Sequence, residues 1–151
     1  RRPGVRILFV GDGPSREELE GRLGGVAAFA GYQVGDALAD HYAAGDLFAF
    51  SSTTETFGNV VQEAMASGMP VVALRAGGVG EIVRDGETGT LLDEDAPPDA
   101  FARALIRLAD RTDERRRMAQ AARAYAESQS WDAIMDALRD RYERVIAPTA
   151  P

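Results

Sequence analysis

One stretch decides how this chain folds: residues 47–73 read LFAFSSTTETFGNVVQEAMASGMPVVA. A four-residue apolar run is followed by a polar turn and then by a helical pattern that ends at Gly68. Val61, Ala64, Met65 and Gly68 recur at the i, i+3, i+4 and i+7 spacing of a buried helical face. The stretch therefore predicts a strand, a short turn and a helix whose first backbone N–H groups can bind an anion.

Two carboxylates, Glu55 and Glu63, bracket the turn. Glu63 lies four residues after Asn59, so the two share a helical face and lean toward the helix start. Because an ionised carboxylate only accepts hydrogen bonds, hydroxyl groups are its natural targets beside an anion site. Phosphate and hydroxyls together indicate a nucleotide sugar. The alternative is that both are solvated acids near a helix N-terminus, where negative charge is favourable.

The rest of the chain predicts an α/β fold. Short apolar runs bounded by Gly, Pro, Asp or Ser are typical of buried parallel strands, and they lie at 5–10, 27–32, 47–50, 71–74 and 89–92. Helical patterns at 15–23, 37–44, 59–67 and 79–84 alternate with them, which predicts a doubly wound, Rossmann-like parallel sheet with flanking helices. After Pro97-Pro98 the pattern is helical, and Trp131 is expected to anchor the last helix, 131–146, in the core.

Composition excludes several functions. The 151 residues suffice for one domain, and no apolar run is long enough to span a membrane. A net charge of −7 argues against nucleic acid as a partner. One histidine, His41, and no cysteine leave no Ser-His-Asp set or metal-ligand cluster, so no metal is expected. Arginines interspersed with acids between residues 103 and 117 predict a solvated helix face.

A dinucleotide cofactor is also not expected. The segment Gly11-Asp12-Gly13-Pro14-Ser15-Arg16 begins like a dinucleotide fingerprint, but Arg16 stands where the third glycine belongs. Pro14 and Ser15 instead fit the start of a helix.

Residues 51–73 closely resemble the E-x7-E region of family 4 retaining glycosyltransferases, which have the two-domain GT-B fold. The similarity covers roughly the whole chain in the family's order, through Val10-Gly11-Asp12-Gly13-Pro14, Phe29-Ala30-Gly31-Tyr32, Gly77-Gly78-Val79-Gly80-Glu81-Ile82-Val83 and Asp85-Gly86-Glu87-Thr88-Gly89. The resemblance implies a C-terminal, donor-binding domain of a hexosyltransferase, spanning residues 1–147 and followed by a frayed tail at 148–151.

The resemblance also implies site residues. Glu63 would accept hydrogen bonds from the ribose hydroxyls, and Glu55, the catalytic candidate, would bind hydroxyls of the donor sugar. The backbone N–H groups of Phe57, Gly58, Asn59 and Val60 would hold the distal phosphate and sugar. The loop with Gly13 belongs to the same donor site, and Tyr32, Gln33 and Val34 are candidates for the base-binding edge. No metal or other cofactor is needed in the family's scheme.

By the same resemblance, the chain is a fragment. It would lack the family's first strand, which lies between the strands matching 5–10 and 47–50, and also the N-terminal acceptor domain. Family members hold the donor diphosphate with an Arg and a Lys near that strand, and this chain contains no lysine. The isolated chain is therefore expected to be inactive.

The partners implied are a nucleotide-sugar donor and the acceptor domain of the same protein. A cytoplasmic location is expected, with peripheral membrane contact through that domain. Two alternatives are a nucleotide-sugar-binding module without activity of its own and a sugar-nucleotide epimerase of similar architecture.

Overall fold

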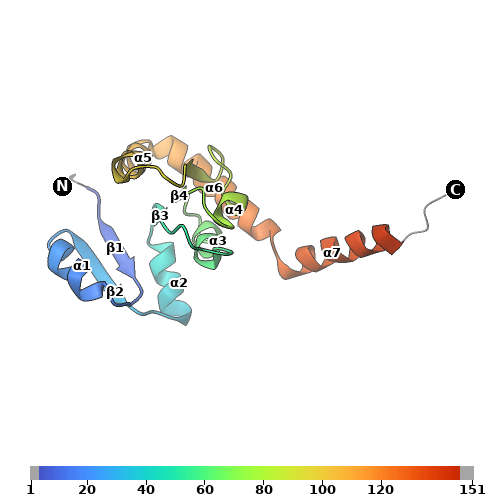
Figure 1. The fold of residues 1–151 in the computed structure, drawn as a ribbon, viewed down its shortest axis with the longest axis horizontal. Coiled ribbons are helices and arrows are strands. Elements are labelled where there is room, and N and C mark those ends of the chain that lie inside the picture. Colours follow the sequence, from blue (N-terminus) through green and yellow to red (C-terminus); the bar gives the residue numbers. More distant parts are fainter. Residues whose placement is uncertain (1–3, 147–151) are drawn as a thin grey trace.

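The computed structural model describes residues 4–146 as alternating strands and helices followed by a helical segment (Figure 1). The predicted tail at 148–151 lies outside these residues. The elements are β1 (Ile7–Val10), α1 (Arg16–Leu23), β2 (Ala27–Gly31), α2 (Gly35–Ala43), β3 (Phe48–Phe50), α3 (Asn59–Ala66), β4 (Val71–Leu74), α4 (Val79–Ile82), β5 (Gly89–Leu92), α5 (Pro98–Asp110), α6 (Thr112–Ser128) and α7 (Trp131–Ile146).

The strands form two parallel sheets. β1 pairs with β2, with Ile7 opposite Ala27, and the other sheet has the order β3-β4-β5. In that sheet Phe48 lies opposite Val71, which in turn lies opposite Gly89. This confirms the predicted α/β class with parallel strands and flanking helices. β1 and β3 do not pair with each other, so each has one unpaired edge, as expected if a strand belongs between them.

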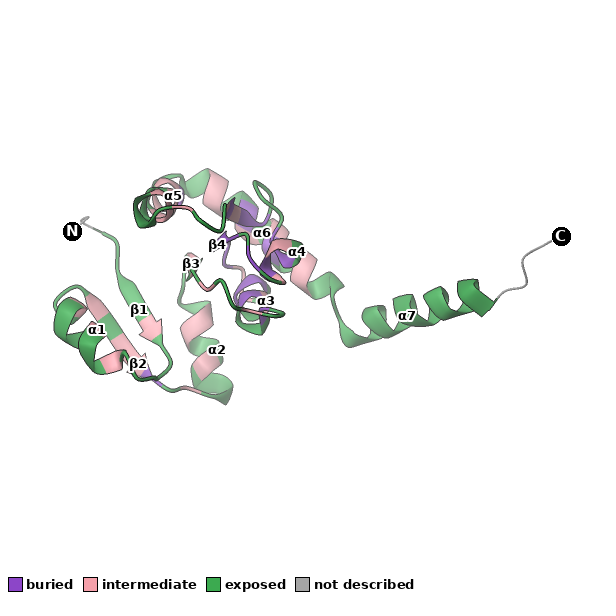
Figure 2. Ribbon diagram, in the orientation of Figure 1, coloured by how far each residue is buried: buried purple, intermediate pink, exposed green. Residues whose placement is uncertain are grey.

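The core forms on both faces of β4, whose four residues are all buried (Figure 2). Side chains alternate across the strand, so Val71 and Ala73 pack with α3, α4 and α6, while Val72 packs with Leu108 and Met118 of α5 and α6. Fully burying a valine, leucine or methionine side chain in this way contributes about 1.5–3 kcal/mol. The predicted helical stripe is confirmed in part, since Val61, Ala64 and Met65 are fully buried and Gly68 is half-buried.

The expectation that every strand is buried is wrong for β1, and in β2 and β3 only Gly31 is buried. Ile7 and Leu8 are each 46% exposed, and Val10 is also exposed. The physical reason is that β1 packs on β2 alone along one edge, whereas β4 has a strand on each side and helices on both faces.

The expected core role of Trp131 is also wrong. Its side chain is 80% exposed, and every residue of α7 is exposed. Figure 1 shows α7 extending away from the rest of the molecule. None of the helices within residues 4–146 combines the length and apolar character needed to cross a lipid bilayer.

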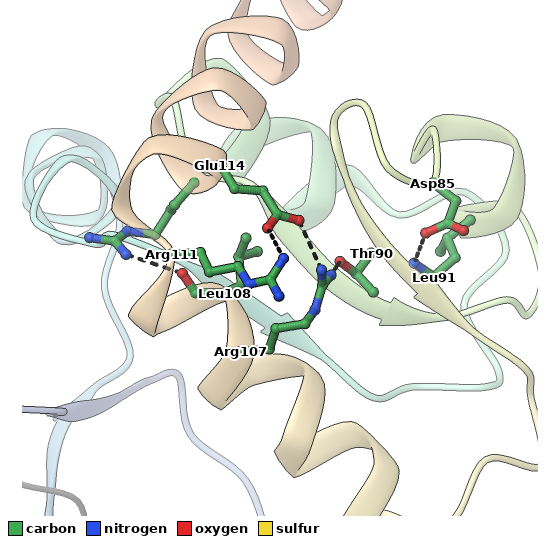
Figure 3. Close-up of polar contacts among 8 residues, drawn as sticks. Asp85, Thr90, Leu91, Arg107, Leu108, Arg111 and Glu114 are labelled. Atoms are coloured by element: carbon green, nitrogen blue, oxygen red, sulfur yellow. Dashed lines mark hydrogen bonds and ion pairs between the residues drawn. The ribbon is translucent and has the colours of Figure 1, made fainter.

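The arginine-rich face of α5 and α6 is only partly solvated, which corrects the prediction for residues 103–117. Figure 3 shows Arg107 reaching both Glu114 and Thr90, at 2.9 Å and 3.1 Å, so it links α5 to α6 and β5. Arg111 donates to the other oxygen of Glu114 at 3.2 Å. Arg115 donates to the carbonyl oxygens of Leu108 and Ala109 near the end of α5. These arginines therefore hold α5 and α6 together.

Glu114 gives the first prediction. Burial, the largest influence, acts to raise its pKa, but the hydrogen bonds and charges of Arg111 and Arg107 more than offset it, so the pKa is lowered from 4.5. A lowered pKa in the folded state adds stability above pH 4.5 that is lost as the pH falls through the folded pKa. Glu114→Gln should therefore lower the free energy of unfolding at pH 7 by about 1 kcal/mol or less, and the difference should shrink at acid pH.

Urea unfolding at several pH values measures this difference. Glu127→Gln is the matched control, because Glu127 also forms an ion pair, with Arg123, but both of those side chains are exposed. A deficit of Glu114→Gln that did not change with pH would contradict the assignment.

The unpaired edges of β1 and β3 give a second prediction. Unpaired strand edges with exposed apolar side chains recruit other strands. We expect the 151-residue chain, expressed by itself, to be unstable, aggregated or dimeric in sedimentation and thermal unfolding experiments. A monodisperse monomer that unfolds cooperatively would contradict this expectation.

Candidate functional site

The segment between β3 and α3 forms an uncapped helix start. α3 begins at Asn59 after Gly58, which has a left-handed backbone with φ of 89°, and no side chain caps the helix. The amides of Val61 and Gln62 bond to the Gly58 carbonyl, whereas those of Asn59 and Val60 have no partner among residues 4–146. Such free N–H groups and the helix dipole together favour an anion.

Glycine at position 58 is required by its backbone conformation, whereas a side chain there would meet α4 only in ordinary van der Waals contact. A Cβ there would lie 3.4 Å from Val79 Cγ2 and 3.5 Å from Ile82 Cδ1 of α4, with a φ that other residues rarely adopt. Burial of Gly58 under α4 therefore fixes where α3 begins.

The loop after β4 packs directly against the loop after β3. A Cβ on Gly77 would collide with the carbonyl oxygen of Glu55, and one on Gly78 would come within 2.5 Å of the carbonyl oxygen of Thr56. Two consecutive glycines after a strand are the sequence signal for so close an approach, but the sequence does not say which segment they approach.

Glu55 lies at the centre of this contact. Its side chain is half-buried, and Oε1 accepts a hydrogen bond from the Phe57 backbone N–H at 3.3 Å. The Phe57 amide, expected to bind the distal phosphate, thus has the Glu55 carboxylate as its partner in this structure.

Glu63 lies on the outer face of α3. Its neighbours Ala64 and Met65 point into the core, which leaves Glu63 exposed. Tyr42, in the last turn of α2, donates a hydrogen bond from its hydroxyl to Glu63 Oε2 at 2.9 Å. Tyr42 was not among the predicted site residues, because it lies 21 positions from Glu63 and no local sequence pattern links the two.

The remaining predicted donor-binding residues lie in the loops after β1 and β2. The Gly11 amide donates to the Gly31 carbonyl at 2.7 Å, which brings these two loops together. Gly13 and Tyr32 are exposed there, and Val34 precedes the first residue of α2. Gln33 donates from Nε2 to the Ala30 carbonyl, also at 2.7 Å. Within residues 4–146, no hydrogen bond or ion pair joins these residues to Glu55 or Glu63, so the predicted site residues form two clusters, and α2 connects them.

A separate hollow lies at the end of β5. That hollow is lined by Asp93 and Asp95 with apolar neighbours and no basic side chain, so it suits a phosphate poorly. Within residues 4–146, no group of three or more His, Cys, Asp or Glu side chains is arranged to hold a metal ion.

Comparison with known proteins decides the family. A sequence model described as "Glycosyl transferases group 1" matches residues 1–111. The chain belongs to this family. It is 42% identical over 142 residues to the sulfoquinovosyl transferase SQD2 of Arabidopsis thaliana, covering 91% of the chain and 28% of that protein. It is 41% identical to a GDP-mannose-dependent alpha-mannosyltransferase of Mycobacterium tuberculosis, covering 93% of the chain and 36% of that protein.

Solved structures agree with this assignment to the group 1 glycosyltransferases. Anabaena HepE in complex with UDP superimposes with a TM-score of 0.73 and 29% identity, over 95% of the chain and 42% of HepE. The expected C-terminal GT-B glycosyltransferase domain is thereby confirmed. The chain spans about a third of the length of the curated relatives it matches.

The contact between the two loops gives a third prediction. Gly77→Ala and Gly86→Ala both place a side chain at positive φ, but only the first also collides with backbone, because the space around Gly86 is open. Gly77→Ala should lower the free energy of unfolding by about 1–3 kcal/mol more than Gly86→Ala, as overpacking does. Urea unfolding of both variants measures the difference. Equal losses would mean that the Gly77 loop does not need to approach Glu55 closely.

Proposed function

We propose that this chain binds the nucleotide-diphosphate sugar donor of a retaining, family 4 glycosyltransferase. The observation that carries the proposal is the geometry of α3 in a member of the group 1 family. Its uncapped N-terminus suits a phosphate, and one turn further on the exposed Glu63 has a carboxylate oxygen, Oε1, without a partner in the described chain. A phosphate next to hydroxyls is the chemistry that a nucleotide sugar presents.

In this proposal each cluster binds one part of the donor. The amides of residues 57–60 hold the distal phosphate and sugar, with Glu55 releasing the Phe57 amide when the donor binds. Glu63 accepts hydrogen bonds from the ribose hydroxyls, and Glu55 those of the donor sugar. The loop that contains Gly13 lies on the side of the donor diphosphate. Tyr32, Gln33 and Val34 bind the edge of the base.

Transfer would break the bond between the anomeric carbon and the phosphate oxygen, and form a bond to the acceptor oxygen on the same face of the sugar. The acceptor's proton would pass to the leaving diphosphate. Electrostatic stabilisation of the developing negative charge is then the main catalytic contribution, and the scheme needs no metal. The N-terminus of α3 supplies part of that stabilisation.

The names of two related proteins support a nucleotide donor. HepE was solved with UDP, and the mycobacterial relative is described as GDP-mannose-dependent. Since these two nucleotides differ, neither base is assigned to this chain. Acceptor binding, an Arg and Lys pair for the diphosphate and a strand between β1 and β3 are proposed to come from the longer polypeptide. A cytoplasmic location with peripheral membrane contact is proposed on the resemblance alone.

A second candidate is a donor-binding module without activity of its own. One observation favours it: among the described residues, no basic side chain forms a hydrogen bond or ion pair with the loop before α3 or with Glu63. The transferase would be favoured if the longer polypeptide contained an Arg and a Lys that were needed for turnover of the donor. An epimerase would need additional acid and base residues that the two clusters do not provide.

Glu63 gives the fourth prediction. Glu63→Gln keeps the side chain's size but removes the charge from a hydrogen bond that contributes about 1.5–3 kcal/mol. Affinity for the donor should fall by about tenfold to a hundredfold, with little change in the unfolding midpoint. Calorimetric titration of the full-length protein with UDP-, GDP- and ADP-sugars measures this, with Glu127→Gln as a surface control. If the donor affinity did not change, the assignment of Glu63 to the ribose hydroxyls would be wrong.

A further inference from the structure

The hydroxyl of Tyr42 has a fixed place beside the candidate site. Tyr42 is half-buried in the last turn of α2, and its ring lies 6.1 Å from that of Phe48 at an angle of 47°. Phe48 in turn stacks on Phe50, with ring centroids 6.2 Å apart. The aromatic side chains of β3 thus hold the Tyr42 ring, which leaves its hydroxyl little freedom to move.

Glu63 depends on that hydroxyl for its orientation. Its side chain is exposed, and within residues 4–146 its carboxylate has no ion pair and one hydrogen bond, from Tyr42 to Oε2 at 2.9 Å. An exposed glutamate without partners samples many rotamers. A single bond from a fixed donor restricts this motion and leaves Oε1 free to accept other hydrogen bonds.

We propose that Tyr42 is a positioning residue for the donor site: its hydroxyl orients Glu63 so that Oε1 can receive the ribose hydroxyls. This inference rests on the proposed function, because Tyr42 would act only through Glu63, the proposed ribose-binding residue. Tyr42 itself is assigned no contact with the donor. It adds α2 to the site, and α2 starts directly after the proposed base-binding residue Val34.

The protonation state of Tyr42 agrees with this role. Burial, followed by the hydrogen bond to Glu63 and the negative charge of that residue, raises the pKa of the Tyr42 hydroxyl. The hydroxyl therefore stays protonated throughout the neutral pH range and always acts as the donor.

The test compares two ligands that differ only at the ribose. The full-length protein is titrated with UDP, GDP and ADP, and the tightest binder is then compared with its 2′,3′-dideoxy analogue. The ratio of the two affinities reports the contribution of the ribose hydroxyls. Because ordering a free side chain on binding costs affinity, Tyr42→Phe should reduce this ratio by about three- to tenfold. Affinity for the dideoxy analogue should not change.

Two further variants complete the design. Tyr125→Phe is the matched control, since Tyr125 on α6 is also half-buried, but its ring lies against Arg84 and its hydroxyl makes no hydrogen bond with Glu63. It should leave the ratio unchanged. Glu63→Gln should reduce the ratio further, and adding Tyr42→Phe to Glu63→Gln should then have no additional effect, because Tyr42 acts through Glu63.

The outcomes separate the inference from the proposed function. If Tyr42→Phe lowered the affinity for both ligands equally, or raised the affinity for the ribonucleotide, the positioning role would be overturned. The proposed function would still stand if Glu63→Gln reduced the affinity ratio. If Glu63→Gln left the ratio unchanged, or none of the three nucleotides bound, the ribose assignment would fail, and the role of Tyr42 with it.

Discussion

Burial of β4 on both faces is the constraint on which the rest of the structure depends. Val71 and Ala73 pack against α3, α4 and α6, while Val72 packs against α5 and α6. Because close-packed interiors deform little, a strand held in this way fixes the helices on either side of it and the loop at its carboxyl end. The glycine pair at that end, Gly77-Gly78, then meets the loop that follows β3.

The candidate site is a consequence of that packing. α3 is fixed by its buried face, so its N-terminus and the outward-pointing Glu63 have defined positions although both are exposed. The proposed ligand-binding groups are exposed, but their positions are defined because the opposite side of α3 is buried in the core. Tyr42 extends this support, since it joins α2 to α3 through a hydrogen bond and packs on Phe48. The buried core thus defines the positions of Glu63 and the N-terminus of α3, although both lie at the surface.

The two ends of the described chain lack this kind of packing. β1 exposes Ile7 and Leu8, and α7 exposes Trp131 and Val145. Both have the apolar residues of buried elements, yet β1 pairs only with β2 and none of the described residues of α7 is buried. The same physical rule holds at both ends of the chain, because apolar side chains become buried only where a second surface is present to exclude water.

The sequence by itself determined the elements and their order. The apolar runs at 71–74 and 89–92 are strands with those bounds, the stripe from Val61 to Met65 is buried, and Trp131–Ile146 is a helix. These features depend on local periodicity, which a single sequence contains. The sequence also identified Glu55, Glu63 and the turn between them, whose roles stay predictions. Only the tertiary structure decided that Tyr42 lies against Glu63, that Gly77 lies against Glu55, that Arg107 joins three elements, and that Trp131 and β1 are exposed. These outcomes depend on which surfaces meet, and contacts between residues far apart in the chain leave no periodic signal in the sequence.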